Sequence, residues 1–312
     1  MPINGIHHIT AVTADLAVNV RFYTHTLGQR LVARTVIQEE PETYHLFYGD
    51  RLGTPGTEMT FFHWPHVKPH RAGARNVNRT TYAAPDEAAV TWWESRLVEN
   101  GIDTIREANG ALAFTAPDGM PLGIVASDAR VHYEHWHDGL IPEAYALRGI
   151  HSNTMGVRNL TETVDFLGEM FGYAVRAQQD NAVQMLLPGG GDNGRLLTVQ
   201  QMDNMGFRGV GSVHHIALRI GGGDHIEDWR ERLLSAGLDV TEVIRRHYFE
   251  SIYARIPGGV LFELATDGRG FAANVDTGTL GESLTLPPFM EDKRSEIEAK
   301  LPPFPEDALY RG

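Results

Sequence analysis

Apolar and polar positions along the chain repeat in one order four times. Each repeat has a short alternating segment, a segment with helical apolar spacing, a glycine, and then further short alternating segments. Alternation with a period of two is typical of strands, and apolar residues three and four apart are typical of one helix face. The predicted helices are 16–27, 85–100, 161–171 and 225–236, followed by Gly28, Gly101, Gly172 and Gly237. The pattern therefore predicts four β-α-β-β-β units of about 60 residues.

The predicted strands complete each unit. They are 5–12, 30–37, 44–48 and 58–64 in unit one; 79–83, 105–107, 111–115 and 121–126 in unit two; 148–157, 173–179, 182–187 and 195–200 in unit three; and 212–220, 251–256 and 260–265 in unit four. Four such units predict an α+β fold in which they pair into two barrel-like domains.

The order of the units also suggests a division of the chain. We expect an N-terminal domain at 1–126, a linker at 127–147, a C-terminal domain at 148–268, and a tail at 269–312 that packs on the domains. The linker carries alternating histidines, which we expect to be solvated because no carboxylate pattern supports them: His132, His135 and His137.

Composition narrows the classes of function. The 312 residues are 42% hydrophobic and 21% charged, and 27 basic against 40 acidic residues give a net charge of −13. This charge argues against nucleic acid or an anionic membrane as a general partner. No run of 18 apolar residues and no signal-peptide pattern occurs, so we expect a cytoplasmic protein. The absence of cysteine excludes disulfides and thiolate metal sites. A homo-oligomer is compatible with all of this.

Two histidine pairs and one carboxylate are the candidate chemistry. His7-His8 and His214-His215 lie in the opening strands of units one and four, and Glu263 lies inside the last apolar strand of unit four. Neighbours in a strand point to opposite faces, so one histidine of each pair can face a cavity. If His8 and His215 face alike, they form with Glu263 the two-histidine, one-carboxylate triad that suits non-haem Fe(II), and also Mn(II).

The other two units serve as an internal control. Unit three has Ser152 where units one and four have His8 and His215, and unit two has Thr81 or Tyr82 nearby. Gly123 and Thr198 stand near the position of Glu263 in units two and three. These units cannot rebuild the triad. The sequence therefore predicts one metal centre, which requires units one and four to lie side by side.

Four segments carry a family resemblance. They are GIHHIT at 5–10, SVHHIA at 212–217, RRHYFESIYARIPGGVLFELATDGRGF at 245–271, and LPPF at both 286–289 and 301–304. The chain resembles the vicinal-oxygen-chelate (glyoxalase, bleomycin resistance and extradiol dioxygenase) superfamily, specifically its hydroquinone ring-cleaving dioxygenases. The resemblance implies Fe(II) held by His8, His215 and Glu263, and a small aromatic diol and O₂ as reactants. It also implies further residues around them: His7, Thr10, His214, Arg246 and Tyr253.

These roles are chemically reasonable. His7 or His214 can move protons, Arg246 can stabilise an anionic oxygen, and Tyr253 can donate a hydrogen bond to substrate. Three alternatives remain open: a catechol-type extradiol dioxygenase, a glyoxalase-type metal-dependent lyase or isomerase, and a metal-free binding protein for small aromatic compounds. The glyoxalase type usually needs a fourth protein ligand, and Glu58 lies too early in its strand for that role.

Overall fold

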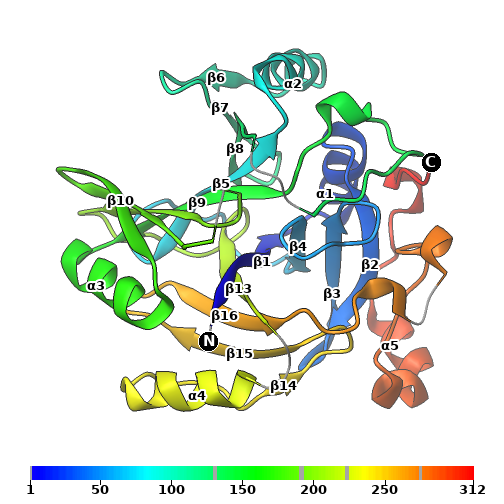
Figure 1. Ribbon diagram of the computed structural model, residues 1–312. Coiled ribbons are helices and arrows are strands. Elements are labelled where there is room, and N and C mark those ends of the chain that lie inside the picture. Colours follow the sequence, from blue (N-terminus) through cyan, green and yellow to red (C-terminus); the bar gives the residue numbers. More distant parts are fainter. Residues whose placement is uncertain (1, 129–131, 190–192, 222–224, 274–275) are drawn as a thin grey trace.

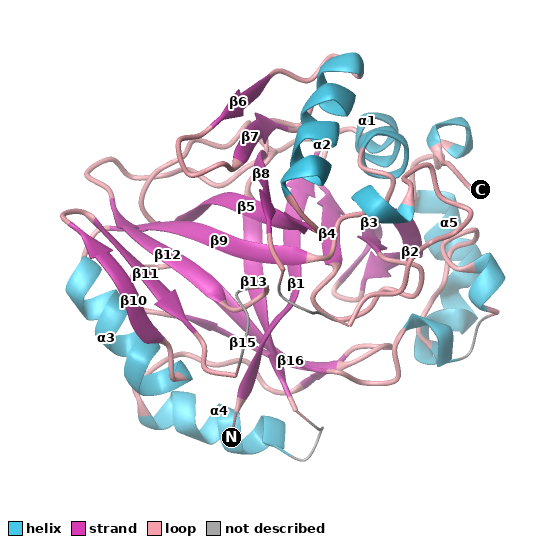
Figure 2. Cartoon of the chain, turned by 45° about the horizontal axis from the view of Figure 1, so that its top comes forward, coloured by secondary structure: helices cyan, strands magenta, loops and turns pink. Residues whose placement is uncertain are grey.

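A computed structural model of the chain describes residues 2–128, 132–189, 193–221, 225–273 and 276–312. Two curled eight-stranded sheets form the body of the molecule, and helices cover their outer faces (Figures 1 and 2). The strand order is β14-β15-β16-β13-β1-β4-β3-β2 in the first sheet and β10-β11-β12-β9-β5-β8-β7-β6 in the second. The predicted α+β class is confirmed.

Each sheet combines two of the predicted units. The first contains β1 Ile3–Thr13, β2 Arg30–Ile37, β3 Glu40–Gly49, β4 Glu58–His63, β13 Val213–Ile220, β14 Ile244–Arg245, β15 Glu250–Arg255 and β16 Leu261–Thr266. The second contains β5 Asn76–Ala84, β6 Thr104–Arg106, β7 Leu112–Thr115, β8 Pro121–Ala126, β9 Ile150–Val157, β10 Ala174–Gln179, β11 Ala182–Leu186 and β12 Leu196–Gln201.

Each sheet joins one unit from the N-terminal half of the chain to one unit from the C-terminal half. Antiparallel pairing of β1 with β13 joins units one and four, and pairing of β5 with β9 joins units two and three. The side-by-side arrangement that the metal centre requires is therefore present. Each sheet draws strands from both sides of the 127–147 segment, so the proposed chain division is not a division between sheets.

The helices are α1 Leu16–Arg21, α2 Glu87–Glu99, α3 Leu160–Phe171, α4 Ile226–Ser235 and α5 Arg294–Lys300. The first predicted helix, 16–27, is divided, because α1 continues as a π-helix over Phe22–Thr26. Within this segment the Thr24 hydroxyl donates to the Val20 carbonyl at 2.7 Å, a bond that competes with the regular helical pattern. Gly28 then ends the segment with φ of 62°.

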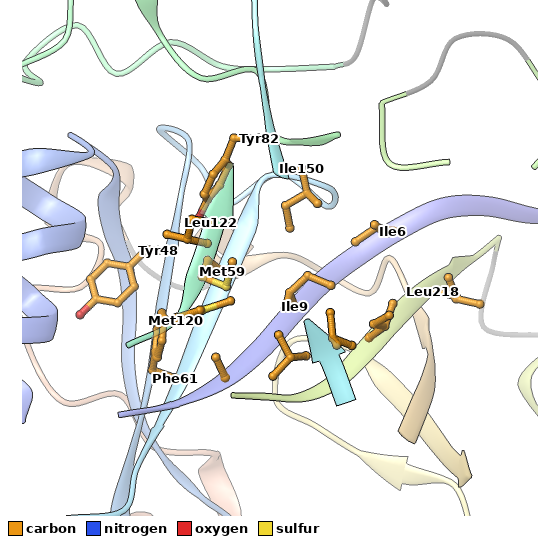
Figure 3. Close-up of a cluster of buried hydrophobic side chains, with 14 of the residues drawn as sticks. Ile6, Ile9, Tyr48, Met59, Phe61, Tyr82, Met120, Leu122, Ile150 and Leu218 are labelled. Carbon is orange, nitrogen blue, oxygen red and sulfur yellow. The ribbon is translucent and has the colours of Figure 1, made fainter. Parts of the chain in front are cut away.

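A shared core holds the two sheets together. Figure 3 shows Ile9 of β1 and Met59 and Phe61 of β4 beside Leu122 of β8 and Ile150 of β9. These side chains are all buried and come from both sheets. Because neighbouring positions of β1 point to opposite faces, packing one set into this core leaves the other set for the concave side of the first sheet.

The C-terminal tail packs on β2. The amide of Thr285 donates to the Arg34 carbonyl at 2.8 Å, and the Arg34 guanidinium pairs with Glu306 at 2.7 Å. Helix α5 lies beside this edge of the first sheet (Figure 1). Within the described residues, none of the helices has the length and apolar character needed to cross a membrane.

Candidate metal centre

Three strands in the middle of the first sheet bring His8, His215 and Glu263 together. His8 lies on β1, His215 on the adjacent β13, and Glu263 on β16, which runs parallel to β13 with Ala217 opposite Glu263. All three side chains are buried. The register of neighbouring strands therefore places on one face residues that are more than 250 positions apart at the extremes.

The donor atoms of these side chains converge. The Nε2 atoms of His8 and His215 are 3.4 Å apart, and Oε2 of Glu263 lies 3.3 Å from the first and 2.8 Å from the second. Donors that each lie about 2.1 Å from one ion at near right angles are about 3 Å apart. The arrangement fits a three-ligand metal site, and the ligand types suit Fe(II) or Mn(II).

Glu263 is the negative group of this site. Neither of its oxygens has a hydrogen bond of acceptable geometry within the described part of the chain, although the side chain is 0% exposed. Burial acts to raise the pKa of Glu263, but the opposing effects of His8 and His215 outweigh it and hold the pKa well below its usual range. An ionised, buried carboxylate with unsatisfied oxygens is what a metal ligand requires.

The first histidine of each pair supports the second. Nδ1 of His7 lies 3.0 Å from Nδ1 of His8, and Nδ1 of His214 lies 2.8 Å from Nδ1 of His215. The second histidine therefore directs Nε2 to the centre and Nδ1 to its neighbour. This is the outer contact that typically fixes the ring of a metal-bound histidine.

A cavity with about 510 Å³ of empty space, which includes space open to solvent, lies beside the centre. His8 and His215 line it, and Phe47, Phe62 and Phe249 form apolar walls. Pro287 of the tail and residues of β2 complete the lining. Flat apolar walls of this kind favour stacking or edge contact with an aromatic ring.

Arg246 and Tyr253 are the predicted residues that line this cavity. The Arg246 guanidinium lies 3.0 Å from both carboxylate oxygens of Glu39, in the turn between β2 and β3. The ring of Tyr253 meets the ring of His215 edge-on at 5.3 Å, and its hydroxyl accepts from Ser251 over a long 3.4 Å. Burial, and next Glu263, raise the pKa of Tyr253, so its hydroxyl is a donor at neutral pH.

The other predicted residues lie behind the cavity wall. His7 and His214 contact the ligand histidines rather than the open space, and burial followed by His215 lowers the pKa of His214 to about 3. Thr10 is buried, and its hydroxyl is 2.7 Å from that of Thr60. The structure thus brings all eight predicted residues into one region, with Arg246 and Tyr253 lining the cavity.

Sequence reasoning missed His45 and Glu39. Nε2 of His45 lies 2.9 Å from the Thr60 hydroxyl, and the ring packs 4.0 Å from that of Phe47, centre to centre. Burial, and next His8, lower its pKa well below the usual range. A histidine in the apolar strand 44–48 was the only available signal for this residue. Glu39 gave no signal, because its partner Arg246 is 207 positions away.

The second sheet has no equivalent centre at the matching positions. In the first sheet, Thr10 lies opposite Thr60 on one neighbouring strand and opposite His215 on the other. In the second sheet, Thr81 takes the place of Thr10 and lies opposite Gly123 and Ser152. Thr198 lies opposite Thr154 in unit three in the same way as Glu263 lies opposite Ala217 in unit four, so Thr198 matches Glu263. Ser152, Gly123 and Thr198 hold the expected positions. The residue matching His8 in unit two is Arg79, not Thr81 or Tyr82, because Arg79 pairs with Thr154.

The linker histidines behave in two ways. His132 and His137 are exposed, as expected, but His135 is half-buried and its Nδ1 lies 3.0 Å from the Tyr133 hydroxyl. Glu143 also approaches, so that ligand atoms of His135, His137 and Glu143 lie within 4.8 Å of one another. The expectation of three solvated histidines without a carboxylate was therefore wrong for His135.

Comparison with known proteins agrees with this geometry. A family model described as the Glyoxalase/Bleomycin resistance protein/Dioxygenase superfamily matches residues 5–123 and 149–264. MhqA and MhqO of Bacillus subtilis, which carry provisional names as ring-cleaving dioxygenases, are 34% and 35% identical over 97% and 96% of this chain, and over 99% and 96% of their own. A chlorohydroquinone/hydroquinone 1,2-dioxygenase of Sphingobium indicum is 31% identical over 95% of each chain.

Solved structures give the same result. A crystal structure of a provisionally named dioxygenase from Bacillus subtilis has a TM-score of 0.90 at 34% identity, and the match covers 98% of each chain. Glyoxalase I from Zea mays has a TM-score of 0.61 at 14% identity, over 84% of this chain and 92% of its own, which shows the fold alone.

Paired curled sheets with a cluster of two histidines and one carboxylate at the middle of one sheet define a protein of the vicinal-oxygen-chelate type. The chain belongs to the Glyoxalase/Bleomycin resistance protein/Dioxygenase superfamily. Within it, the full-length relatives make this protein an enzyme of the ring-cleaving dioxygenase type.

Proposed function

We propose that this enzyme uses Fe(II), bound by His8, His215 and Glu263, to cleave the ring of hydroquinones with O₂. The observation that carries the proposal is the convergence of three donor atoms at 2.8–3.4 Å beside a cavity with aromatic walls. Three protein ligands leave coordination positions open for small reactants. The name of the Sphingobium relative supports hydroquinone rather than another ring as the substrate class.

Iron bound at this site supplies a centre through which an electron-rich ring and O₂ can exchange electrons. The remaining work falls to the protein. Phe47, Phe62 and Phe249 exclude water and hold the ring by apolar contact. His7 and His214 fix the rings of His8 and His215 through the contacts between their Nδ1 atoms.

The polar side of the cavity favours a diol with separated oxygens. A catechol presents two adjacent oxygens that a metal can chelate, whereas a hydroquinone places its second oxygen across the ring. Arg246 and Tyr253 line the cavity and are able to bind that far oxygen. A cation and a neutral donor together suit a phenol or phenolate oxygen.

The glyoxalase-type alternative is weaker. In unit one the position that matches Glu263 is Thr60, which lies opposite Thr10 in the ladder. A hydroxyl there, already 2.7 Å from the Thr10 hydroxyl and 2.9 Å from His45, does not supply a second carboxylate ligand. A metal-free binding protein would not need the three converging donors, which favours the enzyme.

The test is anaerobic reconstitution with Fe(II), followed by oxygen uptake with hydroquinone, chlorohydroquinone and catechol under one set of conditions. We expect the two hydroquinones to be cleaved and catechol to be a poor substrate or an inhibitor. A parallel reconstitution with Mn(II) identifies the metal that supports turnover. Faster cleavage of catechol than of either hydroquinone would refute the substrate assignment, and no oxygen uptake with any metal would refute the proposed chemistry.

A further inference from the structure

Glu58 is a buried carboxylate that the proposed reaction does not use. It is the first residue of β4, lies opposite His8 in the parallel ladder, and is 0% exposed. Neither of its oxygens has a hydrogen-bond partner among the described residues. Its Oε2 lies 3.4 Å from Nδ1 of His7.

Such a group costs folding free energy. Burying a carboxylate without hydrogen bonds is unfavourable, and removing it in favour of an apolar residue often stabilises a protein. The hydroxyl and imidazole groups of the same region are paired, and the two exceptions are Glu263, which belongs to the proposed metal centre, and Glu58, which does not. An unsatisfied buried group of this kind requires a functional explanation.

Glu58 is not placed to be a fourth metal ligand. The donor atoms of the centre are on the Nε2 side of His8, where Nε2 faces Glu263 at 3.3 Å. Glu58 is on the opposite side of the imidazole ring, with the Nδ1 atoms of His7 and His8. Glu58, His7 and His8 form a second cluster of potential ligand atoms within 4.8 Å of one another, which shares His8 with the centre.

The contacts of His7 and His8 determine which of their ring nitrogens carry a proton when Nε2 of His8 binds a metal. A neutral imidazole that coordinates through Nε2 carries its proton on Nδ1. Nδ1 of His8 then donates to Nδ1 of His7, 3.0 Å away, and Nε2 of His7 donates to the Thr266 carbonyl at 3.1 Å. A negative charge beside the two Nδ1 atoms favours the proton at that end of His8.

Unit four provides an internal comparison. His214 and His215 repeat the contact between two Nδ1 atoms at 2.8 Å. Strands β13 and β16 run parallel with Ile216 opposite Phe262, so the residue opposite His215 on β16 is Leu261. Leu261 therefore holds in unit four the place that Glu58 holds beside His8, and among the described residues no carboxylate forms such a cluster with His214 and His215.

We propose that Glu58 is a positioning residue that holds the proton of His8 on Nδ1, through the His7–His8 pair, and thereby keeps Nε2 available to the metal. The inference rests on the proposed metal centre and assigns it an outer carboxylate. It explains why a costly group is kept: Glu58 reduces the stability of the metal-free protein and increases its affinity for the metal. Outer partners of this kind typically change metal affinity by about 10–100-fold.

The decisive variant is Glu58→Leu, which places in unit one the residue that unit four already has. Anaerobic competition with a chelator measures the Fe(II) dissociation constant, and thermal unfolding measures the stability of the metal-free protein. We expect Fe(II) binding to weaken by about 10–100-fold, while the melting temperature of the metal-free variant equals or exceeds that of the wild type. A purely structural role would lower the melting temperature instead.

Two further variants keep the test decisive. Glu58→Gln retains an acceptor oxygen without the charge, and we expect it to recover part of the lost affinity; it also replaces Glu58→Leu if that variant fails to fold. Met59→Leu, at the next buried position of β4, is the matched control and should leave Fe(II) affinity unchanged. Unchanged affinity in both Glu58 variants, or a loss accompanied by an equal loss of stability, would overturn the inference. A wild-type protein that binds no Fe(II) would refute the proposed function and this inference together.

Discussion

Replacing Tyr253 with Phe isolates one hydrogen bond to the substrate. The hydroxyl belongs to a ring that lines the cavity and contacts His215 only edge-on, at 5.3 Å. The Ser251 hydroxyl donates to it over a long 3.4 Å and the Arg246 guanidinium also approaches it; both are donors, so the hydroxyl proton is free to turn to a ligand. The variant removes this donor and leaves His8, His215 and Glu263 in place.

The expected magnitude follows from the type of bond. A neutral hydrogen bond contributes about 0.5–1.5 kcal/mol, and about 1.36 kcal/mol corresponds to tenfold. Tyr253→Phe should therefore lower kcat/KM for hydroquinone by about 2- to 13-fold. Because burial, and next Glu263, raise the pKa of Tyr253, its hydroxyl stays protonated across the neutral range. The ratio of wild type to variant should not change between about pH 6 and pH 9.

Steady-state oxygen uptake measures the ratio, and elemental analysis measures bound iron in the same samples. Iron content should equal that of the wild type. Ser251→Ala is the matched control: it removes the 3.4 Å contact but keeps the Tyr253 hydroxyl, so its effect on kcat/KM should be much smaller. Loss of iron from Tyr253→Phe, or a kcat/KM equal to that of the wild type, would show that the hydroxyl does not act on substrate.

Three further outcomes are expected. Substituting His8, His215 or Glu263 with Ala should abolish iron binding and activity while circular dichroism stays unchanged; full iron occupancy in all three variants would contradict the ligand assignment. Glu39→Gln should raise KM by no more than about fivefold, since its half-exposed ion pair with Arg246, which orients the guanidinium in the cavity, contributes about 0.2–1 kcal/mol. A change in kcat larger than the change in KM would contradict this role. His45 has a depressed pKa and stays neutral when folded, so protonation of the unfolded state lowers stability as pH falls below about 6.5. When the pH falls from 6 to 5, the free energy of unfolding of the metal-free wild type, measured with urea, should decrease by about 1 kcal/mol more than that of His45→Gln.

Much of the fold follows from local patterns. The strands Arg30–Ile37 and Pro121–Ala126 have the predicted bounds, because each is delimited by glycine, proline or turn residues on at least one side. The end of α3 was equally clear, since Gly172 adopts φ of 77° directly after Phe171. The π-helix at Phe22–Thr26 was not predictable, because its apolar spacing resembles that of an ordinary helix.

Other parts of the site depend on contacts that no local pattern contains. Glu39 becomes significant only because Arg246 comes from a distant unit. Pro287 lines the cavity because the tail folds back on β2, and a proline-rich segment gives no indication of where it packs. Trp136 and Ile141 are buried, so the 127–147 segment, which was predicted to be a linker, contributes to the core.

The metal ligands could be predicted because the chain repeats itself. A single His-His pair in a strand is ambiguous, and a single buried carboxylate is equally so. Because the four units share one topology, residues at equivalent positions can be compared between them. These positions hold His8 and His215 in two units, but Arg79 and Ser152 in the others. Only a sheet that joins the first and last units can assemble the triad, and pairing of β1 with β13 forms that sheet. The same comparison marks the difference between Glu58 and Leu261, so the repeat identifies both the shared chemistry of the two histidine pairs and the feature that sets them apart.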